Sequence, residues 1–240
     1  ALVLMLHIHT CDAMGANTVN AVAEGIAEFL AEIAEAQVGL RILSNLCDQR
    51  RVRIRCSIPV EALESASCPD GASVRDGIVA AQRFAELDVY RAVTHNKGIM
   101  NGVDATLVAF GNDWRAVEAG AHAWAARDGR YGPLTKWWLG ETGHLEGELD
   151  MPLATSTVGG AAGVHPGVQL ALRLGDVKSA IDLATLAGCA GLASNLAALK
   201  ALSTEGISRG HMSLHARRIA AEAGAEGDLI DLVAKRLAEE

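Results

Sequence analysis

The sequence has few aromatic residues, no excess of positive charge and no long uninterrupted apolar stretch. Aromatic residues make up 4% of the 240 residues and hydrophobic residues 50%, which is typical of a helix-prone globular chain and not of a disordered one. The net charge of −8 argues against nucleic acid as a partner, because no basic stripe is present to displace phosphate counterions. No run of 18 apolar residues is present, so we expect no membrane span and a cytoplasmic protein.

Disulfide, zinc and dinucleotide fingerprints are missing as well. The cysteines are odd in number and show no CxxC spacing, so we expect free thiols in a reducing compartment and no metal site. The GxGxxG fingerprint is absent, which leaves a doubly wound dinucleotide fold without support. The five cysteines are Cys11, Cys47, Cys56, Cys68 and Cys189.

Apolar periodicity predicts a small α+β unit followed by a mostly helical chain. In the second of two neighbouring strands, Val52, Ile54 and Cys56 alternate with arginines, which indicates one buried face and one solvated face. The tail after residue 203 is expected to form two helices divided at residues 224–227. The expected strands are 2–9, 39–46, 52–60 and a hairpin over 134–149, and the expected helices are 19–33, 74–87, 103–127 with an interruption at Gly111, and 177–203.

Two segments, residues 95–102 and 111–115, place a lysine, an amide and a carboxylate around glycine breaks. Lys97 and Asp113 suit the stabilisation of an oxyanion, because the ammonium meets the developing charge and the carboxylate orients the ammonium. On one straight helix, however, they would lie about 24 Å apart. They can share a site only if Lys97 lies on a turn before the helix, or if two subunits each contribute one. The alternative is ordinary solvated surface charge.

Two glycine-containing segments are candidates for binding phosphate. Residues 12–17 lie between an expected strand and an expected helix, where free N–H groups and the helix dipole favour an anion. The alternative is a plain turn in which Asp12 or Asn17 caps the helix. Gly159 and Gly160 have the same two interpretations, a phosphate loop or a tight turn before Pro166.

His211 and His215 stand four residues apart, as in a zinc-binding helix, but Met212 replaces the glutamate of HExxH and no third ligand is evident. Either histidine is suited instead to act as a general acid, or simply lies on a surface helix. The basic clusters at residues 50–53 and 217–218 suit an anionic small molecule or, as the simpler interpretation, a solvated face.

Taken together, these segments closely resemble the class II 3-hydroxy-3-methylglutaryl-coenzyme A (HMG-CoA) reductases. The resemblance spans nearly all 240 residues in the family's order. Its most specific parts surround Lys97 and Asp113. The matching segments are residues 12–17, 41–46, 90–102, 111–123, 158–160 and 204–212.

The resemblance implies an oxidoreductase that uses NADH or NADPH to reduce HMG-CoA to mevalonate and coenzyme A, or the reverse, through mevaldyl-CoA and mevaldehyde. Lys97 would be the catalytic lysine, Asp113 its carboxylate partner, and His211 the acid that protonates the coenzyme A thiolate. Arg91 would hold the substrate carboxylate and Asn101 would hydrogen-bond near the reacting centre. The implied cofactor-binding residues are Asp12, Met14, Gly15, Asn17, Asn45, Val158, Gly159 and Gly160.

The resemblance also implies an α+β fold in three parts, a homodimer with its active site at the interface, and no metal. Residues 1–46 would be the second half of a small NAD(P)-binding domain, residues 47–203 a large substrate-binding and dimerisation domain, and residues 204–240 a C-terminal helical flap. The family's chains are longer, and their catalytic glutamate has no counterpart here. The alternative is therefore a non-catalytic remnant that dimerises or binds coenzyme A esters without turnover, and a helical metal-binding protein built on His211 and His215 is a weaker third hypothesis.

Overall fold

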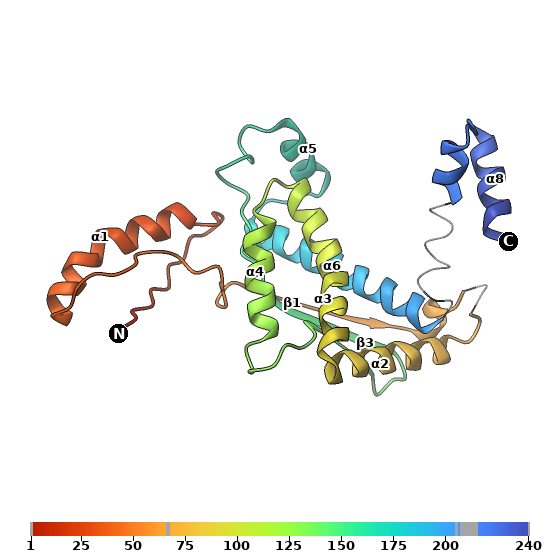
Figure 1. The fold of residues 1–240 in the computed structure, drawn as a ribbon, viewed down its shortest axis with the longest axis horizontal. Coiled ribbons are helices and arrows are strands. Elements are labelled where there is room, and N and C mark those ends of the chain that lie inside the picture. The colour runs from red at the N-terminus through yellow and green to blue at the C-terminus, as the bar shows by residue number, and fades with distance from the viewer. Residues whose placement is uncertain (1, 66–67, 205, 207–215, 240) are drawn as a thin grey trace.

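The structure, a computed structural model, describes residues 2–65, 68–204, 206 and 216–239. A three-stranded sheet and the helices packed on it form the central body, while α1 and the last helices project from opposite sides of it (Figure 1). The helices are α1 (Ala16–Ala34), η1 (Val60–Leu63), α2 (Gly71–Leu87), α3 (Val89–Ala109), α4 (Trp114–Ala125), α5 (Pro166–Leu174), α6 (Ala180–Ser203) and α8 (Asp228–Glu239), and the strands are β1 (Arg51–Ile58), β2 (Thr135–Leu139) and β3 (Leu145–Pro152). The expected α+β class is confirmed.

The sheet is antiparallel with the strand order β1-β3-β2. The predicted hairpin is β2 and β3, and β1 pairs along the other edge of β3, with Val52 opposite Met151. Val52 and Met151 are buried, whereas the arginines of β1 lie on the opposite, solvated face. The predicted two-faced character of β1 is therefore confirmed, and it determines which side of the sheet carries the core.

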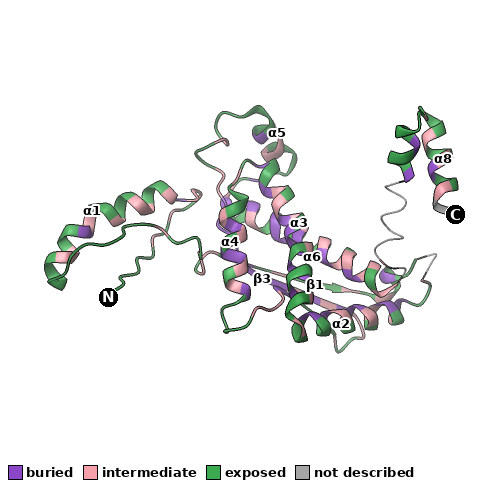
Figure 2. Cartoon of the chain, in the orientation of Figure 1, coloured by how far each residue is buried: buried purple, intermediate pink, exposed green. Residues whose placement is uncertain are grey.

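Helix α3 packs closely against α6 over this core (Figures 1 and 2). A Cβ atom added to Gly102 would lie 2.2 Å from the carbonyl oxygen of Ala190, so the helices can approach this closely only because residue 102 has no side chain. The buried face of α3 includes Ile99 and Val103, which are completely shielded from solvent. This packing also determines which residues of α3 face outward.

A buried polar cluster ties α3 and α6 to the sheet. The Oδ1 atom of Asn195 on α6 accepts hydrogen bonds from Trp137 Nε1 at 2.7 Å and Thr135 Oγ1 at 2.9 Å, both on β2. His95 Nε2 on α3 lies 2.6 Å from Thr135 Oγ1 and 3.2 Å from Asn195 Nδ2. Burial, together with the charge of Arg91, lowers the pKa of His95 to about 4, so this imidazole is neutral at pH 7.

Two predicted strands are wrong, because residues 2–9 and 39–46 have no strand conformation. Single extended segments gain a sheet's hydrogen bonds only by pairing with a neighbour. In the part of the chain that the structure describes, the sheet consists of β1, β3 and β2, and neither segment pairs with a strand of it. Apolar side chains of the first segment are consequently exposed, including Val3 at 79%.

The helix predicted over residues 103–127 is also wrong in its extent. Helix α3 begins at Val89, where the side chain of Asp88 accepts the N–H of Arg91 as an N-cap. The predicted interruption at Gly111 is confirmed, since this residue has a φ of 65° and separates α3 from α4. The short helix α5, which begins with Pro166, was not predicted, although proline at a first helical position is a known signal.

Helix α6 is long and apolar enough to cross a membrane by length and composition alone. Leu183, Ala187 and Leu199 of this helix are completely buried within the fold. Packing against α3 and β1 thus accounts for the apolar residues on the buried side of α6, whereas Ile181 and Leu202 are exposed.

We expect Asn195→Ala to lower the free energy of unfolding by about 2–4 kcal/mol, because it leaves the buried donors of Trp137 and Thr135 without their acceptor. Urea unfolding followed by circular dichroism measures this loss. The matched control is Gln49→Ala, since Gln49 is exposed and bonds only its neighbour Asp48. Equal midpoints for the two variants would show that the buried cluster contributes nothing to stability.

Candidate functional site

Lys97 and Asn101 lie one helical turn apart on the exposed face of α3. Of the three residues between them, Ile99 and Met100 are buried in the core. Arg91, at the start of the same helix, is half-buried, and burial lowers the pKa of its guanidinium. The structure thus brings Lys97 and Asn101 together, on the middle of a helix and not on a turn before it, so that interpretation of Lys97 is wrong.

Asp113 is the N-cap of α4, where its Oδ1 atom accepts the N–H of Ala116 at 3.2 Å. Its carboxylate also lies 3.6 Å from Nε of Arg115. The preceding residue, Asn112, donates its N–H to the carbonyl of Leu107 at the end of α3. Lys97 stands ten residues before Leu107, which is about 15 Å along the helix axis.

Lys97 therefore lies in the middle of α3, whereas Asp113 lies beyond its C-terminal end, at the start of α4. Among the residues that the structure describes, no hydrogen bond or ion pair joins them. The carboxylate of Asp113 instead caps α4 and pairs with Arg115. The first of the two ways in which they could share a site, with Lys97 on a turn before the helix, is thereby excluded.

The two glycine-containing segments predicted to bind a cofactor, residues 12–17 and 158–160, are joined by a hydrogen bond at their edges. The carbonyl of Asp12 accepts the N–H of Thr157 at 3.0 Å, and its Oδ1 atom accepts the N–H of Ala180, the first residue of α6, at 2.8 Å. The side chain of Asn112 bonds both the N–H and the carbonyl of Ser156, at 2.7 and 3.0 Å. Residues 12–17, the loop over 158–160 and the N-terminus of α4 are thereby held in one region.

Helix α1 begins without a side-chain cap. Its N-cap is Gly15, with a φ of 95°, and neither Asp12 nor Asn17 caps it. The alternative of a plain capped turn is therefore wrong, because Asp12 bonds α6 instead. The first N–H groups of α1 are left without a side-chain partner, which is the arrangement that accommodates an anionic group.

Arg50 fixes the loop that precedes α1, a role that the sequence did not reveal. Its guanidinium donates to Thr10 Oγ1 at 3.0 Å and to the carbonyls of Ala13, Met14 and Thr155 at 2.8, 3.2 and 2.9 Å. The neighbouring arginines are also engaged, since Arg51 and Arg53 pair with Asp150. Within the cluster at residues 50–53, Arg50 is thus structural, whereas Arg51 and Arg53 lie on the solvated face of β1 with Asp150 as their ion-pair partner.

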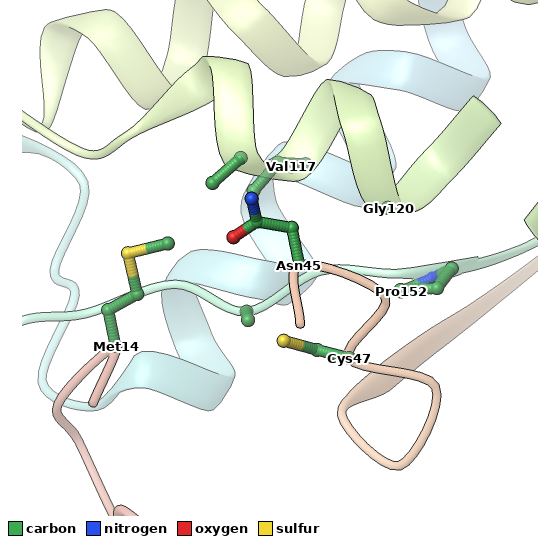
Figure 3. Close-up of a pocket in the computed structure, with 8 residues that line it drawn as sticks. Met14, Asn45, Cys47, Val117, Gly120 and Pro152 are labelled. Carbon is green, nitrogen blue, oxygen red and sulfur yellow. The ribbon is translucent and has the colours of Figure 1, made fainter. Parts of the chain in front are cut away.

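A small pocket under α4 brings together two of the predicted cofactor-binding residues (Figure 3). Met14 and Asn45 both extend toward Val117 of α4, and Cys47 and Pro152 also line the pocket. The carbonyl of Asn45 comes so near to Gly120 that a Cβ there would lie 2.6 Å from it. Met14 and Asn45, which are about 30 residues apart in the sequence, thus line the same side of this pocket.

The residues present fit a dinucleotide at this region. Gly159 and Gly160 both have positive φ values and open space beside them, so the backbone of this loop can be approached closely. Together with the uncapped start of α1, they offer backbone donors rather than cationic side chains. His211 and His215 lie outside the described residues, and elsewhere in the described chain no three His, Cys, Asp or Glu side chains gather to hold a metal.

The family model described as hydroxymethylglutaryl-coenzyme A reductase matches residues 1–216. The chain belongs to this reductase family. Among curated relatives, the 3-hydroxy-3-methylglutaryl-coenzyme A reductase of Archaeoglobus fulgidus is 45% identical over 97% of this chain and 52% of its own. A probable reductase of Borreliella burgdorferi is 36% identical over 90% of this chain and 50% of its own.

Solved reductases have the same fold. A class II 3-hydroxy-3-methylglutaryl-CoA reductase from Streptococcus pneumoniae, bound to NADPH in open conformations, superposes with a TM-score of 0.78 at 44% identity. The match covers 96% of this chain and 56% of that one. The expected resemblance to class II reductases is thus confirmed, and the chain spans about half the length of the reductases it matches.

We expect Gly15→Ala to destabilise the protein by about 1–3 kcal/mol, because alanine at φ 95° is strained and its Cβ would lie 2.3 Å from Thr10 Cγ2. The matched control is Gly25→Ala in the middle of α1, where a Cβ meets no atom within 4 Å. That variant should gain up to about 1 kcal/mol, because alanine favours helix. Thermal unfolding of both distinguishes them, and equal effects would show that the conformation of Gly15 is not required.

Proposed function

We propose that this chain supplies the lysine helix and part of the cofactor site of an HMG-CoA reductase, which reduces HMG-CoA to mevalonate and coenzyme A. The observation that carries the proposal is the exposed pair Lys97 and Asn101 on a helix whose opposite face is fixed in the core. Such a helix holds an ammonium group and an amide at a constant spacing, as electrostatic catalysis at a carbonyl requires.

In this reaction, Lys97 donates a hydrogen bond to the thioester carbonyl and stabilises the negative charge that develops on its oxygen. Asn101 donates to the substrate beside it, and Arg91 binds the substrate's carboxylate, ideally through two parallel N–H···O bonds. Asp113 orients Lys97. His211 protonates the departing thiolate of coenzyme A.

The proposed cofactor is NADH or NADPH, and its reduced nicotinamide, when bound, supplies hydride. Uncapped N–H groups at the start of α1 and the glycine loop at 158–160 support this assignment. Its binding residues are proposed to be Asp12, Met14, Gly15, Asn17, Asn45, Val158, Gly159 and Gly160. The pneumococcal relative was solved with NADPH.

The proposed assembly is a homodimer in which Lys97 of one subunit meets Asp113 of the other. It is supported by the separation of these residues along α3 within one chain. We propose residues 1–46 as part of a cofactor domain, 47–203 as the substrate and dimerisation domain, and 204–240 as a C-terminal flap. A cytoplasmic location is supported by all five cysteines being free thiols.

Lys97→Ala should abolish cofactor oxidation by HMG-CoA while binding of HMG-CoA changes little, because the ammonium acts mainly on the charge that develops during reaction. Absorbance of the reduced nicotinamide measures turnover, and calorimetry measures binding. Both use the polypeptide of the complete reading frame that contains these residues. Lys136→Ala, at an exposed position of β2, is the control and should retain activity. Turnover that survives in Lys97→Ala would remove this lysine from the mechanism.

Mixing Lys97→Ala with Asp113→Asn tests the shared site. Each variant alone should be inactive, but a mixed dimer would contain one site in which both residues are intact. Random reassembly should therefore restore about a quarter of wild-type activity, because half of the dimers are mixed and each has one working site. No restoration, despite subunit exchange shown by mass spectrometry, would place both residues in one subunit's site.

A further inference from the structure

The proposed mechanism leaves unused a polar cluster between α3 and α4. Asp104 on α3 faces Glu118 on α4 within hydrogen-bonding range. Glu118 Oε2 lies 3.0 Å from His122 Nε2, and His122 Nδ1 lies 2.8 Å from the hydroxyl of Tyr131, whose ring stacks on the imidazole. The cluster thus runs from α3 across α4 to the loop after α4.

One atom of this cluster is unsatisfied as long as both carboxyls are ionised. Asp104 Oδ1 is buried and has no donor from any described residue. Two facing carboxylates have no proton with which to bond each other, and their like charges repel. A single proton on the pair removes both problems, because the acid then donates an O–H···O bond to the carboxylate.

The surroundings favour that proton. Burial, with added effects from the hydrogen bond to Glu118 and its charge, raises the pKa of Asp104 to about 7. The titratable groups that face the pair are His122 on α4 and Tyr131 in the following loop. Within the described chain, no lysine or arginine forms an ion pair with either carboxyl, and Arg115, one turn before Glu118, pairs with Asp113.

We propose that Asp104 and Glu118 share one proton and that this hydrogen bond fastens α3 to α4, which makes both of them positioning residues for Lys97 and Asn101. Asp104 follows Lys97 by seven residues on the same side of α3, and Glu118 follows Asp113 by five. The bond therefore joins the helix that presents the lysine to the helix that Asp113 caps. The consequence for catalysis rests on the proposed function, whereas the shared proton itself does not.

The sign of the pH effect follows from the raised pKa. Between about pH 4 and about pH 7 the folded protein holds a proton that the unfolded chain has already released, so stability falls as pH rises across this range. Above about pH 7 the proton is lost to solvent, and two partly buried negative charges then push α3 and α4 apart.

The first experiment compares the thermal unfolding of the complete protein and Asp104→Asn between about pH 5 and about pH 8. An amide is neutral at every pH and donates N–H where the shared proton stood. We expect the wild-type Tm to fall by about 5 °C over this range and the Tm of the variant to fall much less, so that the variant is the more stable protein at the alkaline end. Asp128→Asn, at an exposed position, is the control and should keep the wild-type slope. Equal slopes in wild type and Asp104→Asn would overturn the proposal.

Infrared spectroscopy provides a second measurement, and its deciding spectrum is that of the wild-type protein. The wild-type protein should show the C=O stretch of one buried carboxylic acid near pH 6, and the band should vanish as pH rises through the neutral range. Glu118→Gln should remove the same band. A wild-type spectrum without it would overturn the shared proton.

The pH dependence of kcat distinguishes a positioning role of Asp104 and Glu118 from an effect on stability alone. With the enzyme folded at all pH values, kcat of the wild type should fall at alkaline pH several-fold more than kcat of Asp104→Asn, with KM for the cofactor unchanged. Identical pH profiles, together with different unfolding slopes, would retain the shared proton and overturn its positioning role. An enzyme without turnover at any pH would contradict the proposed function but leave the unfolding and infrared results to decide on the pair.

Discussion

The close approach of α3 to α6 is the constraint on which the rest of this structure depends. It is possible because Gly102 has no side chain to collide with the Ala190 carbonyl, and it is held in register by His95, Thr135 and Asn195. A helix has a fixed angular step, so residues that are buried on one face determine those that are exposed on the other. The positions of Lys97 and Asn101 are therefore consequences of what α3 buries, and a site built this way moves only if the core moves.

Those parts of the fold that rest on local patterns could be predicted from the sequence. The alternation of apolar residues and arginines in β1, the β2–β3 hairpin and the break at Gly111 all follow from period and turn chemistry. The strands expected at residues 2–9 and 39–46 could not be judged in this way, because a short apolar run becomes a strand only if another strand pairs with it. The start of α3 was locally encoded by Asp88, whose capping role could have shown that Lys97 lies within a helix.

The candidate site was predictable to a different degree. The resemblance indicated the cofactor loops, and the structure does bond Asp12 to Thr157, just before the loop over 158–160, and places Met14 and Asn45 in one pocket. The supporting residues were not predictable. Arg50 bonds atoms up to 105 residues away, and Asn112 bonds a residue 44 positions later. No local pattern marks such residues, since their role is defined by partners that only the folded chain brings near.

The exposure of Lys97 places a physical requirement on the proposed chemistry. An ammonium in bulk water interacts with a charge 4 Å away by only about 1 kcal/mol, whereas the same pair in a site from which water is excluded interacts several times more strongly. The face of α3 that carries Lys97 also exposes large apolar side chains, Tyr90 at 88% and Val108 at 60%. A surface that covers this face would bury apolar area and would also exclude water from the ammonium group of Lys97. The second subunit proposed here meets both demands, because it also brings the carboxylate of Asp113 that α3 and α4 of one chain hold away from Lys97.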